Sequence, residues 1–205
     1  SRKGFADTGE GRAQGLEFFL QKKFADKWYG TCSYSLSKSE GKDQRKGKNK
    51  YYSWDFDYGN VVTLIGGYKF KFRESKWYQR FRESTIFPYI SWIPFMVSDQ
   101  LELSFRYSYS GGRPYTPKHY NFRYRSWFVD PAEDLNTARY DHYSRLDIMI
   151  LRRFNFKKIN LTTFLDIQNI FDRDNIWAIM YLEDGTTKMS LQYKQMPVCG
   201  ITIEF

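Results

Sequence analysis

Hydrophobic and polar residues alternate with a period of two in seven segments of this 205-residue chain. In one of them, Leu101, Leu103 and Phe105 alternate with Glu102, Ser104 and Arg106. Successive side chains of a β-strand point to opposite faces, so this pattern predicts strands with one apolar and one polar face. The apolar faces span residues 16–24, 28–36, 62–72, 101–109, 146–154 and 161–171, and a final strand ends at Phe205.

The predicted strands are long. Most of their apolar faces cover about nine to eleven residues, the length with which a tilted strand crosses the hydrocarbon layer of a membrane, whereas strands of soluble sandwiches usually have about five or six. We assign Phe24 to the apolar face of the first strand and Phe171 to that of the sixth. In the last strand Ile201, Ile203 and Phe205 share a face. The pattern predicts an all-β fold, a transmembrane antiparallel β-barrel with lipid on one face and water on the other.

The connections also alternate. Ala25-Asp26-Lys27 and Lys157-Lys158 are predicted tight turns, as on the periplasmic side of a barrel, and the polar segments 38–60, 110–140 and 172–196 resemble extracellular loops. Segment 74–98 is a long connection on the short-turn side. Its residues Trp77, Tyr78 and Phe81 have helical spacing beside Arg73, Arg80 and Arg82, which predicts a short interfacial helix. An irregular loop with an extra hairpin broken by proline is the alternative.

The composition narrows the class of protein. Mean hydropathy is −0.66 and no apolar run is long enough for a membrane-spanning helix, while aromatic residues make up 20% of the chain. A soluble, aromatic-rich β-sandwich remains the alternative on composition alone. The net charge is +9, but no nucleic-acid-binding motif accompanies it, so we expect no nucleic-acid partner.

Seven strands are too few to close a barrel, and open sheet edges are costly in lipid. We therefore expect the chain to be the C-terminal part of a larger barrel or to be completed by another polypeptide. The chain has no signal peptide and begins at Ser1 without a methionine, so the native start is expected to lie upstream. Cys32 and Cys199 are predicted to lie five strand steps apart, roughly 24 Å at the usual strand spacing, too far for a disulfide, and to face lipid.

Several short sequence motifs, in the order in which they occur, resemble the C-terminal barrel of TonB-dependent outer-membrane receptors. They are Gly11-Arg12-Ala13-Gln14-Gly15-Leu16-Glu17, Trp28-Tyr29-Gly30, Asp55-Phe56-Asp57, Tyr107-Ser108-Tyr109-Ser110-Gly111-Gly112-Arg113-Pro114-Tyr115, Tyr143-Ser144-Arg145-Leu146-Asp147, Leu165-Asp166-Ile167-Gln168-Asn169-Ile170-Phe171 and the terminal Phe205.

The resemblance implies a barrel of about 22 strands with a plugged lumen. Residues 1–205 are then the last seven strands of one barrel domain, and the plug and TonB box lie outside this chain. The implied function is TonB-energised uptake of a scarce nutrient, such as a ferric siderophore, cobalamin or an oligosaccharide, across the outer membrane of a Gram-negative bacterium. The implied partners are the rest of the barrel and the plug, membrane lipid and lipopolysaccharide, the TonB complex and a surface lipoprotein. A passive porin-like or surface-interaction barrel without energy coupling is the alternative.

The resemblance also gives the polar faces a role. Charged side chains are expected to point into the lumen, either as structural contacts between plug and wall or as substrate contacts. These residues are Glu102, Arg106, Arg145, Asp147, Arg153 and Asp166. Phe205 is expected to be the end of the signal that the barrel-assembly machinery reads, a role compatible with that of an ordinary aromatic at the membrane interface.

The loop after the fourth strand is dense in rings and cations, which stack on sugars or aromatic ligands and pair with anions. The predicted ligand-binding residues are Arg113, Tyr115, Tyr120, Tyr124 and Trp127. The alternative is that these rings fold the loop and contact lipopolysaccharide. The basic run from Lys38 to Lys50 is predicted to be a solvated loop tip, with binding of lipid-head phosphates as a weaker alternative.

No catalytic residue, metal site or cofactor is predicted. His119 and His142 lie near Asp130 and Asp141 in sequence, and Ser126 or Ser144 is available as a nucleophile, but nothing has motif spacing. Two histidines and two distant cysteines do not form a metal-ligand set. We therefore predict no enzyme activity. A hydrolase built on the barrel is a third hypothesis, beside the receptor and the porin-like barrel. It predicts that mutation of either histidine abolishes an enzymatic activity while the protein still folds.

Overall fold

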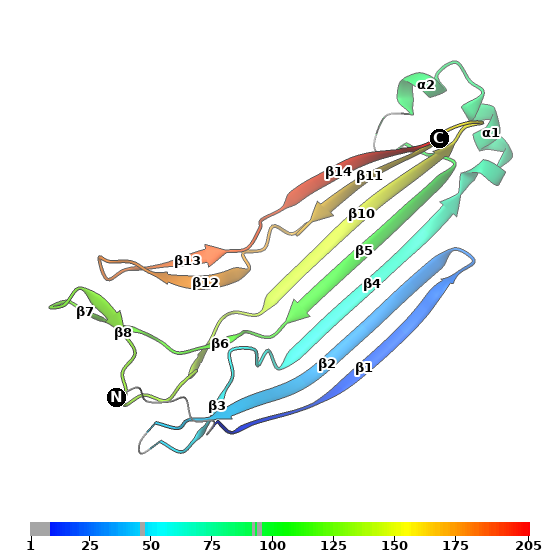
Figure 1. Cartoon of the computed structure of the whole chain (residues 1–205). Coiled ribbons are helices and arrows are strands. Elements are labelled where there is room, and N and C mark those ends of the chain that lie inside the picture. The colour runs from blue at the N-terminus through cyan, green and yellow to red at the C-terminus, as the bar shows by residue number, and fades with distance from the viewer. Residues whose placement is uncertain (1–8, 46–47, 92, 94–95) are drawn as a thin grey trace.

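The computed structural model describes residues 9–45, 48–91, 93 and 96–205, and its main feature is one antiparallel sheet (Figure 1). Seven long strands pair in the order in which they occur in the sequence, and the short strand β3 (Tyr51–Ser53) pairs with β2. The long strands are β1 (Gly11–Ala25), β2 (Trp28–Lys42), β4 (Asn60–Lys71), β5 (Gln100–Ser110), β10 (Tyr143–Asn155), β11 (Asn160–Gln168) and β14 (Met196–Glu204). The prediction of seven antiparallel strands is confirmed.

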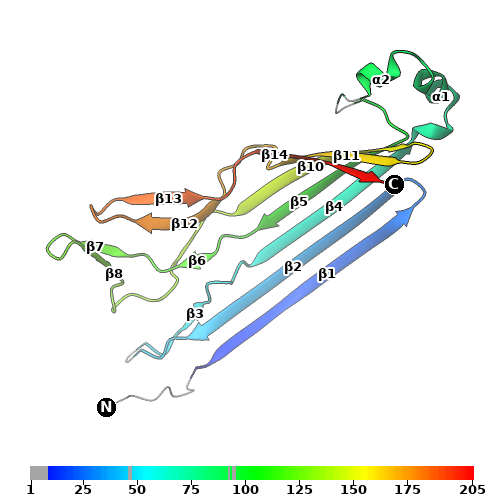
Figure 2. The same cartoon turned by 45° about the horizontal axis from the view of Figure 1, so that its top comes forward.

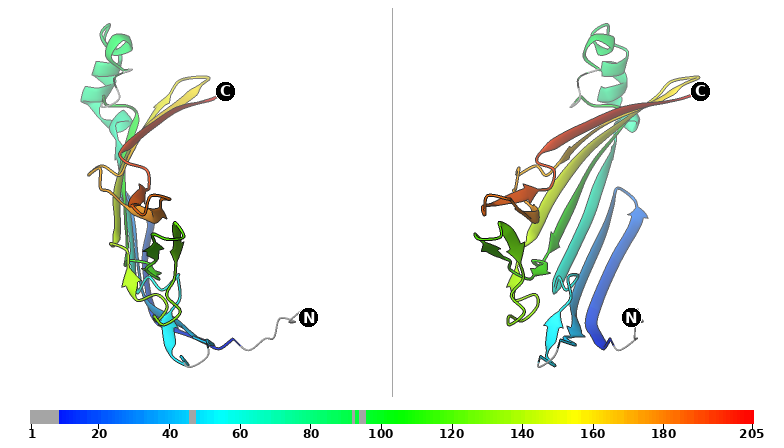
Figure 3. Two further views of the ribbon diagram at one scale, coloured as in Figure 1. Left: turned by 90° about the vertical axis from the view of Figure 1, so that its left-hand side faces the viewer. Right: turned by 60° about the vertical axis from the view of Figure 1, so that its left-hand side comes forward.

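The predicted tight turns join β1 to β2 and β10 to β11, and the three long polar connections contain further short strands. These are β6 (Pro114–Tyr115), β7 (His119–Asn121), β8 (Ser126–Phe128), β9 (Ala138–Arg139), β12 (Ile176–Tyr181) and β13 (Thr187–Leu191). The sheet is curved along its strands, and Figure 3 shows it edge-on. Its concave face carries most of the polar positions of the pattern and its convex face the apolar positions.

The second strand extends beyond its apolar face. The apolar face of the second strand ends at Leu36, but β2 continues to Lys42 and pairs with β1 as far as Gly11 opposite Gly41. Backbone hydrogen bonds between strands do not require apolar side chains. The hydrophobic pattern therefore identified the faces of this strand but set its long-loop end too short.

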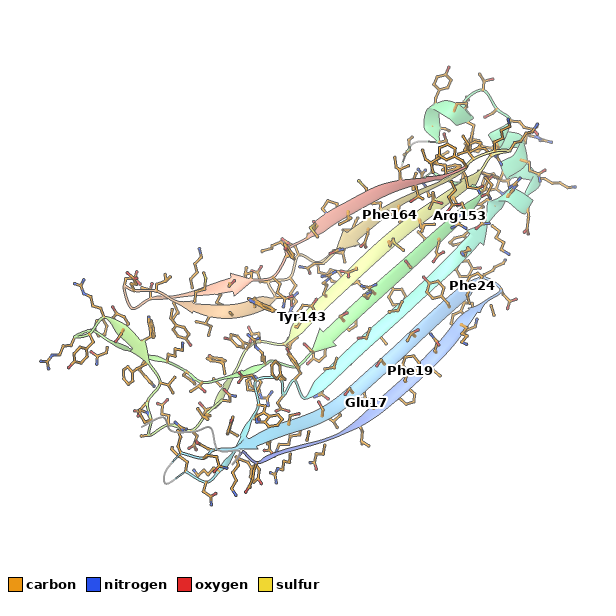
Figure 4. The ribbon with its side chains drawn as sticks, viewed as in Figure 1. Glu17, Phe19, Phe24, Tyr143, Arg153 and Phe164 are labelled. Carbon is orange, nitrogen blue, oxygen red and sulfur yellow. The ribbon has the colours of Figure 1, made fainter. Side chains whose placement is uncertain are left out.

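Phe24 was assigned to the wrong face. The register of β1 and β2 shifts between Lys22 and Ala25, which turns Phe24 to the concave face. There the Lys69 ammonium lies 4.6 Å from the centre of the Phe24 ring, and the Tyr29 ring lies 6.4 Å from it. Figure 4 labels Phe24 with Glu17, Phe19, Tyr143, Arg153 and Phe164, which occupy concave-face positions.

Phe171 is also misplaced by the pattern, because β11 ends at Gln168. Asn169 follows with a φ of 51°, and its N–H donates to the Asp147 carboxylate at 2.9 Å. This left-handed residue turns the chain away from the sheet, so Phe171 lies in the following turn with its side chain largely exposed.

Aromatic rings cover glycines across neighbouring strands. Gly66 pairs with Phe105 on the convex face, and a Cβ added to Gly66 would come within 2.6 Å of the ring. Gly67 with Tyr29 and Gly200 with Phe164 repeat the arrangement on the concave face. A ring over a glycine restores the packing that the missing side chain would have supplied.

A helical segment (residues 72–91) connects β4 to the chain leading into β5. It consists of the 3₁₀ turn η1 (Phe72–Glu74), α1 (Lys76–Arg82) and α2 (Phe87–Ile90). Figure 3 shows it on the convex side of the sheet, at the end of the tight turns. The predicted helix is confirmed here, and the alternative of an extra hairpin is wrong.

The helical segment covers the main buried hydrophobic cluster, which contains Tyr78, Phe87 and Phe154. Phe154 comes from the convex face of β10, so the cluster joins the segment to the sheet. Arg152, two residues before Phe154, is only 4% exposed. Its guanidinium donates to the backbone carbonyls of Ser91, Ile93 and Met96, which satisfies a cation on an otherwise apolar face.

Candidate functional site

The three long connections gather at the end of the sheet opposite the helical segment (Figure 2). They comprise residues 43–59, 111–142 and 169–195, of which residues 46–47 lie outside the described part of the chain. Side chains from each connection contact another, so the loops form one body beside the strand ends. The predicted ligand-binding residues all belong to the middle loop.

Asp57 and Arg139 join the first loop to the second. Asp57 is buried, with 2% of its surface exposed, and the Arg139 guanidinium donates both to its carboxylate and to its backbone carbonyl. The Ser39 N–H donates to the same carboxylate at 3.0 Å. Burial by itself raises the pKa of Asp57, but the Ser39 N–H and the Arg139 guanidinium outweigh it and hold this pKa below its ordinary value.

The basic run is only partly a solvated loop tip. Lys38 and Lys42 lie within β2, and Lys46 lies outside the described residues. Lys48 pairs with Asp134 at 2.9 Å, and Arg45 donates to the Glu133 carbonyl at 2.8 Å. The run therefore helps to hold the first loop against the second.

Aromatic residues join the second loop to the β12–β13 hairpin. The Trp127 ring lies 4.8 Å from Tyr181, and its indole N–H donates to the Leu182 carbonyl at 2.7 Å. Tyr120 packs 5.2 Å from Trp127, and its hydroxyl donates to the Glu183 carbonyl. These two predicted ligand residues are thus used to fold the loops together.

A pocket of about 310 Å³ lies where the loops meet the concave face of the sheet. Its floor includes Val61, Ser110 and Tyr143, which form one row across β4, β5 and β10. Its walls come from Arg113 and from Tyr58, Tyr140, Asp141, Ile176, Trp177 and Gln192. The pocket thus combines residues from all three loops, and it is the strongest candidate for a binding site among the described residues.

Arg113 is the predicted residue that lines this pocket. Its guanidinium lies 5.3 Å from the centre of the Tyr140 ring and 5.7 Å from that of Trp177. It donates to the Trp177 carbonyl at 2.9 Å, and within the described chain no carboxylate lies within 4 Å of it. A cation held between two rings, with donors left over, suits a ligand that carries a negative charge and a flat or ring-shaped group.

The five predicted ligand residues are therefore not brought together. Tyr115 is not a lining residue but packs against the wall residue Tyr140, with 4.5 Å between the ring centres, while Tyr124 is exposed at the tip of the β7–β8 hairpin. The sequence analysis missed Tyr140 and Trp177. Tyr140 is close to Tyr143 in sequence, and Trp177 lies in the apolar run 176–182 within a long connection. Both signals were visible in the sequence, but nothing in it placed these residues beside Arg113.

The six predicted lumen-facing residues share the concave face. Arg106 is the cross-strand neighbour of Asp147, and Asp166 lies in the neighbouring row of the same face. Most of the carboxylates already have partners within the sheet: Asp147 pairs with Arg145 at 2.6 Å, while Glu102 accepts from Tyr29 at 2.9 Å and lies 3.4 Å from Lys69. Arg106 and Arg153 are exposed. This pairing favours a role for the carboxylates in the wall itself.

Asp147 has a second structural role, through the motif that ends β11. Its carboxylate accepts from the Asn169 N–H, and farther along the same loop Asn175 exchanges two 3.0 Å hydrogen bonds between its side chain and the backbone of Ser144. Asn169 and Asn175 are both buried. They fix the third loop to the start of β10 and thereby place Trp177, two residues beyond Asn175, at the pocket.

The remaining candidates lie apart from the pocket or have partners. Phe205 follows β14 and is 99% exposed, and the two cysteines are free thiols at convex-face positions. His119 contacts Glu133 and His142 contacts Arg173. Within the described ranges no group of three histidine, cysteine or acidic side chains is placed to hold a metal ion. The described helices are all too short or too polar to cross a membrane.

Comparison with protein-family models, with curated proteins and with solved structures found no match to this chain.

Proposed function

We propose that this chain forms the C-terminal part of the barrel wall and extracellular loops of a TonB-dependent outer-membrane receptor. One observation carries the proposal: the convex apolar face of the sheet is uncovered along most of its length. Leu103 and Phe105 lie on β5, with strands on both sides, yet they are 40% and 45% exposed. Lipid is the environment that such a face suits, because a soluble protein rarely leaves so large an apolar area in water.

The surface area of the chain supports the same conclusion. A compact soluble protein of 24.7 kDa exposes about 10,000 Å², whereas this chain exposes 15037 Å². Among the described residues only Tyr78, Phe87 and Phe154 are buried hydrophobic residues. The sheet does not fold around a core of its own, so its stability must come from lipid, from further strands or from both.

The two edges of the sheet support closure by further strands. Within the described chain, β1 pairs only with β2 and β14 only with β11. Unpaired N–H and C=O groups in hydrocarbon cost several kcal/mol each, so a membrane sheet has to continue until it closes. In the proposal the edges pair with the remaining strands of a barrel of about 22, a size taken from the resemblance.

The proposed mechanism begins with capture of the nutrient at the Arg113 pocket, above the concave face that would line the lumen. A plug outside these 205 residues then rearranges when TonB pulls on it. The Arg113 cation and the aromatic walls of the pocket favour a ligand that combines a negative charge with a ring system, such as a ferric siderophore, and the Asp141 carboxylate in the same wall can accept from a hydroxyl or N–H of that ligand. A passive porin or surface-interaction barrel is the second candidate, since it has the same two-faced sheet.

Two measurements test the class of protein. We expect the polypeptide to be found in native outer membranes, to require detergent for extraction, and to have an intact mass several times 24.7 kDa. A mass close to that of this chain would require another polypeptide to close the barrel and would remove most support for a transporter. Extraction without detergent would refute a membrane barrel.

Uptake assays separate the receptor from the porin. A panel of radiolabelled ferric siderophores, cobalamin and oligosaccharides is offered to wild-type cells, to a deletion strain and to a strain without TonB. A receptor predicts that uptake of one ligand is lost in both mutants, whereas a porin predicts uptake that is independent of TonB. Arg113→Ala should weaken binding of that ligand by about tenfold or more. Arg123→Ala, at the exposed β7–β8 tip, is the matched control.

A further inference from the structure

The end of the sheet with the tight turns carries a dense group of cations. Residues 71–82 contain five cations and one carboxylate. Of these, Arg73, Lys76 and Arg80 are exposed, and no carboxylate among the described residues lies within 4 Å of them. Lys157 and Lys158 in the β10–β11 turn add to the same end of the sheet. This concentration of exposed positive charge is suited to binding an anionic partner from outside the described chain.

Exposed apolar side chains lie in the same segment. Trp77, Ile86 and Tyr89 are 53%, 62% and 73% exposed, although the buried faces of α1 and α2 hold Tyr78 and Phe87 against the sheet. Tryptophan and tyrosine next to basic residues are the side chains that proteins place at the level of lipid headgroups. If the segment were surrounded by water alone, the apolar surfaces of these three side chains would remain hydrated and would contribute no burial energy.

The segment is fixed to the convex face and to the strand ends beside it. Phe154 and Leu161, a cross-strand pair of that face, belong to the cluster beneath it, and Arg152 holds the chain that follows α2. Arg82 bonds to Asp99 and to the Asn155 carbonyl, which ties α1 to the ends of β5 and β10. The cations and rings therefore sit on a rigid support at the margin of the apolar band.

From this arrangement we propose that the helical segment binds the headgroups of anionic phospholipids in the membrane leaflet at the tight-turn end. The phosphates contact Arg73, Lys76 and Arg80, and Trp77, Ile86 and Tyr89 enter the boundary between headgroups and acyl chains. The inference rests on the proposed membrane location of the sheet but not on transport. It assigns the segment a role in anchoring this end of the wall to the bilayer.

The test uses the complete protein purified in a mild detergent and titrated with phosphatidylglycerol or phosphatidylcholine, with bound lipid counted by native mass spectrometry. The triple variant Arg73→Gln, Lys76→Gln, Arg80→Gln should bind phosphatidylglycerol about 100-fold more weakly. Each cation near an anionic surface strengthens binding roughly fivefold, and three such factors multiply to about 100. Phosphatidylcholine binding should not change. The matched control removes three exposed cations from the loop end, with Arg123→Gln, Arg125→Gln and Lys188→Gln, and should bind like wild type.

Unchanged phosphatidylglycerol affinity in the triple variant would overturn the inference, as would an equal loss in the loop-end control. Tighter binding of lipid A than of phosphatidylglycerol to the wild-type segment would also overturn it. The charge-preserving pair Arg73→Lys, Arg80→Lys should retain the affinity, which separates loss of charge from loss of structure. If the purified protein needs no detergent, the proposed function fails first; if it needs detergent but has no preference for phosphatidylglycerol, only this inference fails.

Discussion

Arg152 offers the sharpest test of how the helical segment is held. It is the one arginine of the described sheet that occupies a buried convex-face position, beneath the chain that follows α2. Arg152→Leu keeps a side chain of similar bulk and removes every donor. The carbonyls of Ser91, Ile93 and Met96 then lose the partner that the wild-type protein provides.

The expected size of the effect follows from these contacts. A hydrogen bond to a charged group contributes about 1.5–3 kcal/mol net. The three hydrogen-bond energies do not simply add, because the three carbonyls share one guanidinium. The leucine also removes the free-energy cost of burying a charge, which reduces the net loss further. We expect the docking of the segment to weaken by about 2–3 kcal/mol, which corresponds to about 30- to 150-fold more frequent local opening.

Amide hydrogen exchange of the complete protein in detergent measures this opening directly. Exchange of residues 76–91 should accelerate by that factor in Arg152→Leu, while the amides of β2 and β4 stay protected. Arg153→Leu is the control, because Arg153 is exposed on the opposite face, where it donates a 3.4 Å hydrogen bond to the Thr162 hydroxyl. If the segment exchanges at the same rate in wild type and Arg152→Leu, or equally fast in both variants, Arg152 does not hold it.

Three further predictions concern the loops and the sheet. Asp57→Asn should destabilise the loops by about 1.5–3 kcal/mol at neutral pH. Because the pKa of Asp57 is lowered in the folded state, the carboxylate contributes its full stabilisation above about pH 3.9 and loses it as the pH falls through the folded pKa. The thermal unfolding curves of wild type and variant should therefore converge in acid. Gly66→Val places a side chain against the Phe105 ring and should lower stability to denaturant by about 1–3 kcal/mol, whereas Gly30→Val, with its nearest neighbour 3.6 Å away, should cost less. Trp127→Ala should make the β12–β13 hairpin more sensitive to protease while cleavage of the first loop is unchanged.

The seven strands were predictable because one simple rule governs them. A sheet with different surroundings on its two faces needs apolar and polar residues in alternation. This alternation can be read in each strand from β1 to β14 without knowing which strands pair. The tight turns predicted the pairs β1–β2 and β10–β11, since antiparallel neighbours need few connecting residues. The other four neighbouring pairs are joined by long connections, and their order followed from the general tendency of consecutive strands to lie side by side. The free state of Cys32 and Cys199 then followed from the strand order alone.

The positions of Phe24 and Phe171 were not predictable by the same rule. In both places the backbone departs from regular strand geometry, through a register shift after Lys22 and through the left-handed Asn169. A period-two pattern assigns faces correctly only while the backbone stays regular. Both residues lie at strand ends, where the constraint imposed by neighbouring strands is weakest.

The kinds of residue at the candidate site were predictable, but which residues line the pocket was not. The density of rings and cations after β5 drew attention to Arg113, which does line the pocket. Its companions Tyr140 and Trp177 come from opposite ends of two loops, and Trp177 is placed by Asn175 and its bonds to Ser144. Such contacts depend on how the loops fold on one another, which local sequence patterns do not encode.

Two irregularities of the sequence explain each other once the fold is known. Arg152 places a charge on the otherwise apolar face of β10, and the 74–98 connection is long on a side where the other turns are tight. Each alone looks like a local exception. A charge on a lipid-facing surface must be covered or paired, and in this fold the long connection supplies both the cover and the carbonyl partners. An arginine in an apolar row of a predicted membrane sheet is therefore a reason to search the neighbouring connections for a segment that packs against the outside of the wall.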